Sequence, residues 1–469
     1  MKPWSSICLG VVLMLAGTSV SRLRAATPVS VWLTDPGGVA RFEQQASPRE
    51  FGSPGPEGGA VLEVSDRRHY QEMVGFGFTL TGGSAQLIRA MSESAREALL
   101  TELFAAGGTH IGVSYLRISV GASDLNSRVF TYDDLVPGET DPDLLRFDLG
   151  PDRTGVIPVL RQILSVNPRV GIMASPWTAP SWMKTNGDSK GGSLKRECYG
   201  IYARYLVKYV ETLRTEGISL DALTIQNEPL NPDNNPSMVM TAPEQAEFIR
   251  DHLGPAFRTA ALKTKIVCYD HNADHPDYPL TVLADPGARS YVEGSAFHLY
   301  AGSIDALSRV HDAHPDRSLY FTEQWIGAPG SLVGDLGWHL TEVVVGSCRN
   351  WCRTVLEWNL AADPNHGPHT DRGGCDRCLG ALTLDGDRVV RNPAYYIIAH
   401  ASKFVRPGSV RIDSSVLEGL PNVAFRTPEG RTVLVVLNHG SSPRTVTVRA
   451  EAGLLPLVLP AGSAATCVW

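Results

Sequence analysis

Eight apolar runs recur along the middle of the chain and alternate with stretches in which apolar residues return every three or four positions. Stretches such as "SESAREALLTELFA" and "YGIYARYLVKYVETLRTEG" have the second pattern, which predicts helices. The apolar runs, which predict strands, are MVGFGFTLT (73–81), SYLRISVGASD (114–124), RVGIMASPW (169–177), ALTIQNEP (222–229), KIVCYDHN (265–272), GSAFHLY (294–300), SLYFTEQW (318–325) and TVLEWNLA (354–361). Near-continuous apolar strands are typical of a parallel sheet covered on both faces. Eight such strand–helix units therefore predict a (β/α)8 barrel.

Shorter strand-like segments lie on both sides of this region. Before it are "VSVWLTD", "RFEQQA" and "AVLEVSD", and after it are "VAFRTPEG", "TVLVVLNHG", "RTVTVRA" and "SAATCVW". Neither group alone would bury a good core, so we expect the N-terminal strands to complete a C-terminal β-sandwich. The predicted organisation is a barrel over 73–404 and an all-β sandwich domain made of 27–72 and 405–469.

The composition is that of an ordinary globular protein, with 43% apolar and 19% charged residues. The net charge is −7 and neither sign forms a long run, which disfavours nucleic acid or an anionic membrane surface as a partner. A neutral partner is expected.

The first 26 residues have the features of a signal peptide. Lys2 precedes an apolar stretch from Ile7 to Gly17, and small residues follow around Ala25 and Ala26. The apolar stretch is too short to span a bilayer, and no later run is long enough to do so. We therefore expect a secreted or periplasmic protein without integral membrane association.

Seven cysteines follow that segment, so at least one thiol has no intramolecular partner. Cys348, Cys352, Cys375 and Cys378 have spacings that suit either a four-thiolate zinc site or disulfides. An oxidising compartment favours disulfides, and either arrangement would stiffen a loop.

Two of the predicted strands end on a glutamate. "ALTIQNEPL" brings Glu228 to the end of the fourth strand, and "SLYFTEQW" brings Glu323 to the end of the seventh. Asn-Glu-Pro alone would also suit the start of a helix. In a (β/α)8 barrel, however, the carboxyl ends of the strands carry the active site, so the two carboxylates would face each other across the mouth.

Such a pair can attack and protonate a glycosidic bond from opposite sides. A separation of about 5 Å predicts retention of anomeric configuration, and one of roughly 6.5 to 9.5 Å predicts inversion. Glu228 suits the proton donor and Glu323 the nucleophile. We expect the pKa of Glu228 to be raised while Glu323 is charged, since like charges disfavour ionisation.

Arg117, in the second strand, needs a carboxylate partner inside a barrel. It is expected to hold Glu323 ionised and oriented, or else to form a structural pair with Asp124 or another acid. Asp124 itself has two open interpretations, a sugar contact or a loop-fixing residue.

The chain resembles glycoside hydrolase family 30, in particular its glucosylceramidase branch. The resemblance is carried in order by "GFGFTLTGGSAQLI", "LRISVGASD", "ASPWTAPSWMKTNG", "GSLK", "QNEP", "HLY", "FTEQ" and "WNLA". It implies a barrel fused to a β-sandwich, no metal or organic cofactor, and a retaining mechanism with acid/base Glu228 and nucleophile Glu323.

The resemblance also implies a sugar subsite, whose residue types suit that role. Indole faces stack on a pyranose ring, and an asparagine amide can donate to the 2-hydroxyl. Trp177 and Trp358 taken alone would more often be core residues, but their positions at strand ends favour the subsite. The subsite residues that the resemblance implies are Trp177, Asn227, Tyr300 and Trp358.

One position departs from the glucosylceramidases. Gly82 stands where they place an aspartate that grips distal hydroxyls of a terminal glucose, so the far end of the pocket is expected to be open. This favours a substrate such as β-1,6-glucan, which relatives in the family cut internally. His369, Asp371 or Arg372 in the loop after the eighth strand could compensate.

Alternative interpretations remain at this stage. The enzyme could act on another β-glycoside, such as a xyloside or fucoside, or the barrel could bind glycans without turnover. The pairs His366 with His369 and His271 with His275 could be metal ligands, but such pairs on barrel loops are more often sugar contacts or solvated. We therefore expect no metal.

Overall fold

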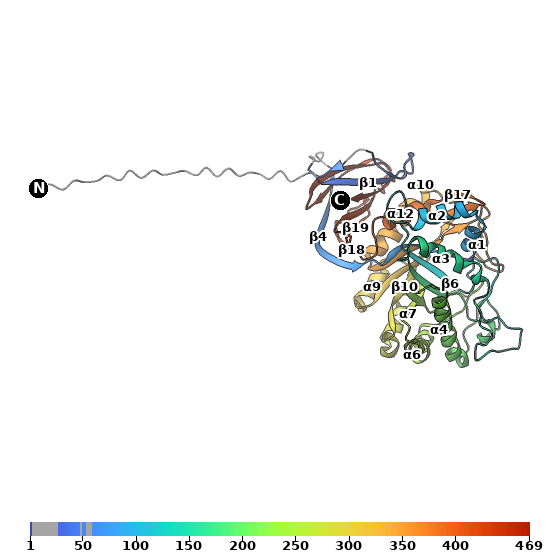
Figure 1. The fold of residues 1–469 in the computed structure, drawn as a ribbon. Helices are drawn as coiled ribbons and strands as arrows, with labels where there is room; N and C mark the ends of the chain where they lie inside the picture. The colour runs from blue at the N-terminus through green and yellow to red at the C-terminus, as the bar shows by residue number, and fades with distance from the viewer. Residues whose placement is uncertain (2–26, 47–48, 53–58) are drawn as a thin grey trace.

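The computed structural model of the chain describes residue 1 and residues 27–46, 49–52 and 59–469. It consists of a barrel and a β-sandwich packed against each other (Figure 1). The predicted signal peptide and Cys8 lie outside the described residues.

The barrel is closed and contains the eight predicted strands, which confirms the predicted fold class. All its neighbouring strands are parallel, in the order β10-β11-β13-β5-β6-β7-β8-β9. The strands are β5 (Gly75–Thr79), β6 (Tyr115–Val120), β7 (Gly171–Pro176), β8 (Ala222–Thr224), β9 (Lys265–Asn272), β10 (Val292–His298), β11 (Ser318–Glu323) and β13 (Cys352–Asn359).

Helices follow the strands and cover the outside of the barrel (Figure 1). Residues 242–259 form two short α-helices joined by the π-helical turn η4, which lies directly before Gly254 and Pro255. The helical elements are α1 (Gly82–Ala90), α2 (Glu93–Phe104), η1 (Gly150–Arg153), α3 (Val156–Val166), η2 (Ser181–Met183), η3 (Arg196–Cys198), α4 (Tyr199–Thr215), α5 (Ala242–Phe248), η4 (Ile249–Leu253), α6 (Gly254–Thr259), α7 (Asp277–Ala284), α8 (Pro286–Arg289), α9 (Ala306–Ala313), α10 (Leu332–Trp338), η5 (His339–Gly346), α11 (Ser347–Arg349) and α12 (Pro393–Ser402).

The sandwich combines strands from both ends of the chain. The order of its strands is β2-β1-β23-β20-β19-β18-β4-β21-β22, with β3 beside β1. Strand β4 joins the layers, because its first residues pair with β21 and its later ones with β18. The strands are β1 (Pro28–Thr34), β2 (Arg41–Gln44), β3 (Arg49–Glu50), β4 (Ala60–Glu72), β18 (Val410–Ser414), β19 (Asn422–Arg426), β20 (Thr432–Leu437), β21 (Arg444–Ala450), β22 (Gly453–Leu459) and β23 (Ala464–Val468).

Short strands also form in the loops beyond the barrel. Two small sheets pair β12 with β15 and place β14, β16 and β17 together. These strands are β12 (Ile326–Gly327), β14 (Ala361–Ala362), β15 (Cys378–Leu379), β16 (Leu382–Asp385) and β17 (Arg388–Arg391).

The barrel interior is packed rather than hollow. One buried residue from each of seven strands forms a single apolar cluster, and Val74 packs against it just before the remaining strand. The cluster contains Tyr115, Met173, Ala222, Val267, Ala296, Tyr320 and Leu356. This apolar floor restricts any reactive site to the layer above it, at the carboxyl ends of the strands.

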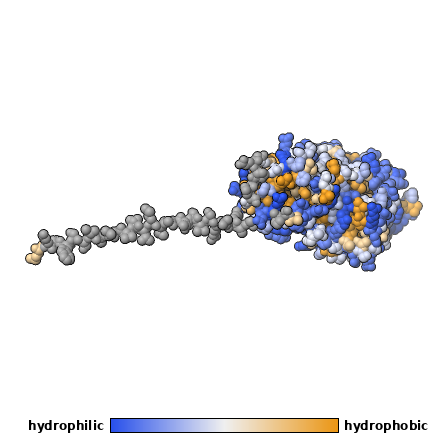
Figure 2. All heavy atoms as spheres, turned by 90° about the horizontal axis from the view of Figure 1, so that it is seen from above, coloured by the Kyte–Doolittle hydropathy of each residue, from blue (hydrophilic) through white to orange (hydrophobic). Residues whose placement is uncertain are grey.

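The molecular surface is mixed in character. On the face shown in Figure 2, hydrophilic residues predominate and apolar residues occur in separate patches. Among the described residues, no helix combines the length and apolar character that crossing a bilayer requires.

Candidate active site

A layer of polar side chains lies above the apolar floor, and the buried carboxylate of Asp270 on β9 is its centre. Arg117 Nη2 donates to Asp270 Oδ2 at 2.8 Å, and His298 Nε2 lies 3.1 Å from Oδ1. Three hydroxyls also donate to this carboxylate, from Ser175 at 2.5 Å, Thr224 at 2.8 Å and Thr322 at 2.7 Å. Burial would raise the pKa of Asp270, but the charge of Arg117 and these bonds hold it well below its usual range.

The two predicted glutamates reach this layer in different ways. Glu323 is the last residue of β11. Strand β8 ends at Thr224, and Glu228 follows it with a φ of 45°, its amide N–H bonded to the carbonyl of Asp270 at 2.9 Å. A non-glycine residue in that region costs on the order of 1–3 kcal/mol, which the packed surroundings of Glu228 must offset.

Glu228, His298 and Glu323 form a compact cluster. One nitrogen or oxygen atom from each lies within 4.8 Å of the other two. His298 Nδ1 lies 3.2 Å from Glu228 Oε1 and 3.8 Å from Glu323 Oε1. Asn231 Nδ2 donates to the other oxygen of Glu228 at 2.7 Å. Both carboxylates are 6% exposed, so each retains slight contact with solvent.

The ionisation of the cluster differs from the sequence-based expectation. Burial alone would raise the pKa of Glu228, but the hydrogen bond and charge of His298 lower it, so the expected raised pKa of Glu228 is wrong for this site. Burial raises the pKa of Glu323 despite the nearby cations. Burial would lower the pKa of His298, yet the charge of Glu323 and hydrogen bonds to Asp270 and Glu228 raise it to about 9.

Arg117 contacts Glu323 as expected, with Nη1 donating to Oε2 at 2.5 Å. It also pairs with another acid, Asp270, and its Nη2 donates to Asn227 Oδ1 at 2.6 Å. Because the amide oxygen of Asn227 is bound by Arg117, the amide nitrogen is the group left to donate.

The two predicted tryptophans stack on each other beside Arg117. The ring centroids of Trp177 and Trp358 are 5.5 Å apart, and the Arg117 guanidinium lies 4.7 Å from the Trp177 ring. Trp177 Nε1 has no hydrogen-bond partner among the described residues. Tyr300 is 37% exposed, and its hydroxyl donates to Glu323 Oε1 at 3.0 Å.

Asp124 is buried close to the glutamates. Burial and the charges of Glu323 and Glu228 raise its pKa to about 7. Two residues further on, Asn126 occupies the space beside Gly82. A Cβ at Gly82 would lie 1.9 Å from Asn126 Nδ2. The opening expected from the missing aspartate is therefore filled, at the glycine itself, by a neutral amide.

The structure does not bring His369 into the cluster. It is exposed, and its Nδ1 lies 3.0 Å from the carbonyl oxygen of Thr370. In the same loop, Arg372 pairs with Asp188, and the amide of Asn235 donates to Asp371. These contacts tie the loop after β13 to the loops after β7 and β8.

One disulfide, Cys375–Cys378, closes a short turn in that loop. Both cysteines adjoin the cluster that contains Trp177 and Trp358. Cys348 and Cys352 are free and buried, so the four cysteines do not form a common zinc site.

Metal-like spacing occurs, among the residues that the structure describes, in the trio of Glu228, His298 and Glu323. Neither predicted histidine pair belongs to such a group there. Protonated His298 and Arg117 already supply positive charge to both carboxylates, which reduces the need for a cation. The absence of a bound metal stays a prediction.

Sequence reasoning missed Asp270 and His298. A buried aspartate inside the apolar run "KIVCYDHN" was the signal for the first, since an acid in a barrel strand needs partners. "HLY" was part of the resemblance, but the contact of His298 with both glutamates depends on the register of three strands.

Comparisons with known proteins find relatives for both domains. Residues 73–405 match the glycosyl hydrolase family 30 TIM-barrel domain, and residues 408–467 match the family's β-sandwich domain. An endo-1,6-beta-D-glucanase of Aspergillus fumigatus is 33% identical, over 95% of this chain and 96% of its own. The lysosomal acid glucosylceramidase of Mus musculus is 30% identical, over 88% of this chain and 84% of its own.

A similar fold is found among solved structures. The endo-beta1,6-glucanase BT3312 superposes with a TM-score of 0.88 at 33% identity, covering 94% of this chain and 99% of its own. Since both family domains match in sequence and a relative in that family aligns over nearly the whole length, the chain belongs to glycosyl hydrolase family 30 and is a glycosidase.

Proposed function

We propose that this protein is a retaining endo-β-1,6-glucanase in which Glu323 is the nucleophile and Glu228 the acid/base. The observation that carries the proposal is the approach of the two carboxylates to within 4.8 Å. That distance suits direct attack by one carboxylate and is too short for the intervening water of an inverting enzyme.

In the first step, Glu323 attacks the anomeric carbon while a proton from Glu228 passes to the departing glycosidic oxygen. In the second, the Glu228 carboxylate takes a proton from water, whose oxygen attacks the same carbon and releases Glu323. Trp177 and Trp358 form the aromatic wall of the sugar subsite, and the amide nitrogen of Asn227 donates to the 2-hydroxyl.

His298 resolves the conflict between a lowered pKa and the role of proton donor. In the resting site the proton resides on His298, whose Nδ1 donates to Glu228 Oε1 at 3.2 Å. Transfer along this bond makes Glu228 a carboxylic acid and leaves a neutral imidazole, whose Nε2–H remains bonded to Asp270. The raised pKa of His298, about 9, keeps this proton in the site at neutral pH.

The substrate assignment rests on the relatives and on Asn126. The endo-1,6-beta-D-glucanase of Aspergillus fumigatus and the endo-beta1,6-glucanase BT3312 align over 95% and 94% of this chain, whereas the mouse glucosylceramidase aligns over 88% of it. A neutral amide beside Gly82 lacks the charge that would bind a terminal glucose through several hydroxyls.

The test is digestion of β-1,6-, β-1,3- and β-1,4-glucans and of glucosylceramide, with product lengths and the first-formed anomer followed by chromatography and NMR. We expect short β-1,6 oligosaccharides released first as the β-anomer. Glucose released singly would rule out endo action, and an α-anomer would rule out retention.

For location, we propose that residues 1–26 direct export and are removed, on the basis of Lys2 and the apolar stretch 7–17. Mass spectrometry of protein from the periplasm or medium should find an N-terminus near Thr27, whereas intact Met1 would contradict the proposal.

A further inference from the structure

A cavity of about 630 Å³ lies at the junction of the barrel and the sandwich, away from the glutamates. Its wall includes Gly107 and Gly108 before β6, Arg169 before β7, and residues at the end of α12. Loops that precede barrel strands lie at the amino-terminal face. The cavity is therefore at the opposite end of the barrel from Glu228 and Glu323.

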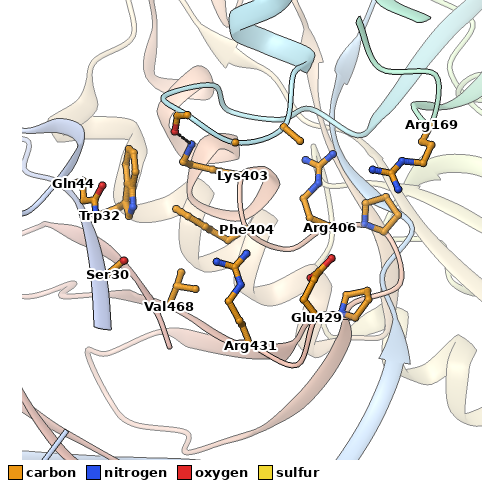
Figure 3. Close-up of a pocket in the computed structure, with 15 residues that line it drawn as sticks. Ser30, Trp32, Gln44, Arg169, Lys403, Phe404, Arg406, Glu429, Arg431 and Val468 are labelled. Carbon is orange, nitrogen blue, oxygen red and sulfur yellow. Dashed lines mark hydrogen bonds between the residues drawn. The ribbon is translucent and has the colours of Figure 1, made fainter. Parts of the chain in front are cut away.

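The charge of this wall opposes that of the whole chain. Four basic side chains, from Arg169, Lys403, Arg406 and Arg431, line the cavity together with one acid, Glu429 (Figure 3). The local surplus of three positive charges occurs in a protein whose net charge is −7.

Within the described part of the chain, none of these four cations has a carboxylate within the 4.0 Å of an ion pair. By contrast, Arg426, at the end of β19 and just before the turn that carries Glu429, pairs with Asp66 at 3.6 Å. The cavity thus gathers, within one wall, four cations that lack an ion pair to the described residues.

Two of the cations are fixed in place by backbone carbonyls. Lys403 Nζ donates to Gly108 at 2.7 Å and to His110 at 2.8 Å, and Arg406 Nη1 donates to Gly112 and Ser402. Among the residues that the structure describes, the Nε and Nη2 donors of Arg406 have no hydrogen-bond partner. The exposed side chains of Arg169 and Arg431 make no hydrogen bond to the residues described, so they are free to bind a ligand.

Glu429 offsets the positive charge of the cavity only in part. Burial lowers the pKa of Lys403, and the charge of Arg406 lowers it further. Burial and the charge of Arg169 likewise lower the pKa of Arg406. An anion between these groups would relieve both effects, and guanidinium forks match the oxygens of a carboxylate or phosphate.

Part of the remaining wall is apolar, beside the polar Ser30 and Gln44. Trp32, Phe404 and Val468 line it, and the ammonium of Lys403 lies 4.7 Å from the Trp32 ring centroid. A volume of about 630 Å³ is in the range of small-molecule sites. An aromatic and aliphatic wall beside a cationic one suits a ring that carries an oxyanion.

We propose that this cavity is a second ligand site that binds an acidic sugar, with its oxyanion between Arg406, Arg431 and Arg169 and its ring against Trp32 and Phe404. The oxyanion is a carboxylate, as in a uronic acid, or a phosphate, as in a sugar phosphate. Because the site lies at the other face of the barrel, its occupancy does not block substrate at the glutamates.

The test is calorimetric titration of the full chain with glucuronic acid, glucose 6-phosphate, glucose and inorganic phosphate. We expect saturable binding of glucuronic acid or glucose 6-phosphate, weakened by salt. Tighter binding of glucuronic acid would identify the oxyanion as a carboxylate, and tighter binding of glucose 6-phosphate would identify it as a phosphate. The Arg169→Gln/Arg431→Gln variant should bind it at least 10-fold more weakly while hydrolysing β-1,6-glucan normally.

The matched control is Arg309→Gln/Arg388→Gln, which removes two exposed arginines that lie outside the cavity and form no ion pair with the described residues. It should bind like the wild type. Equal binding by both double variants, or no saturable binding of either acid, would overturn the site. Equal affinity for inorganic phosphate and glucose 6-phosphate would overturn the role of the apolar wall.

Discussion

The two glutamates make different contacts, and those contacts predict different effects of mutation. Glu323 is held by Arg117 and Tyr300, whereas Glu228 is bonded to His298 and Asn231. Glu323→Ala should lose roughly 10³-fold or more in turnover, and azide should restore part of it by entering the emptied space. Glu228→Ala should keep activity on aryl glucosides whose leaving group needs no protonation. High activity of both variants on poor leaving groups would refute the assignment.

His298 predicts a specific change in the pH profile. In the wild type, the shared proton is lost as pH rises through about 9, the raised pKa of His298. In His298→Gln the proton has only Glu228 to occupy, so the alkaline limb of kcat should move to lower pH. The measurement is kcat against pH for a poor and a good leaving group. The shift should appear only with the poor one, and an unmoved limb would contradict proton storage on His298.

Gly82 and Asn126 form a steric pair that stability measurements can test. Asn126 Oδ1 accepts from the Ser123 amide at 2.9 Å, so the amide cannot swing aside without losing this bond. Gly82→Ala should therefore cost about 1–3 kcal/mol in free energy of unfolding. In an Asn126→Gly background, the same Gly82→Ala substitution should cost much less, so Gly82→Ala/Asn126→Gly should be nearly as stable as Asn126→Gly alone. A Gly82→Ala protein as stable as the wild type would show that Asn126 yields freely.

At the scale of elements, the apolar pattern predicted all eight barrel strands because each is buried on both faces. The pattern extended the fourth predicted strand too far, because β8 ends at Thr224 and the residues from there to Glu228 do not belong to the strand. It missed β22, which contains Pro456 and is an edge strand beside β21, as proline requires. The domain boundaries stay predictions.

The site was predictable where a strand end carried a reactive residue, as at Glu228 and Glu323. The contacts that set their protonation were not, because Asp270 and His298 meet them only through the stagger of neighbouring strands. Asn126 was missed for a similar reason, since a glycine in the sequence does not show which side chain fills its space.

Helix α12 is tied to the sandwich by a buried histidine. His400 Nδ1 lies 2.8 Å from Thr466 Oγ1 on β23, and Nε2 lies 2.9 Å from Thr34 Oγ1 on β1. Thr466 donates its hydroxyl proton to the His400 carbonyl, so Nδ1 must be the donor, while Nε2 accepts from Thr34. Burial lowers the pKa of His400 to about 3, consistent with this neutral form.

This arrangement predicts acid sensitivity. Below about pH 6.5 the unfolded histidine gains a proton that the folded one does not bind until about pH 3, so stability falls as pH falls through that window. Between pH 7.5 and 4.5 the wild type should lose about 2–3 kcal/mol more than His400→Gln, measured by denaturant unfolding. Parallel pH curves for the two proteins would contradict a neutral buried His400.

At the scale of the whole molecule, the barrel and the sandwich share one apolar core. Trp32 and Phe42 from the N-terminal strands and Phe425 from β19 belong to the same buried cluster as the barrel's outer side chains. Phe76 of β5 packs edge-on against Phe425, with ring centroids 6.4 Å apart. Such continuity predicts that both parts unfold together.

Arg349 makes polar contacts between the barrel and the sandwich, so its substitution tests whether the two parts unfold together. From α11, its Nε donates to the Asn422 carbonyl at 2.7 Å, and its Nη2 donates to the Ser414 hydroxyl at 2.9 Å. Arg349→Ala would leave these sandwich acceptors without a partner, at a cost of about 2–4 kcal/mol. Calorimetry should show one transition for the wild type and a lower one for the variant, with Arg309→Ala on α9 unchanged. If the barrel transition of Arg349→Ala stays in place while the sandwich alone melts earlier, the two parts are separate folding units, because a shared core would lower both together.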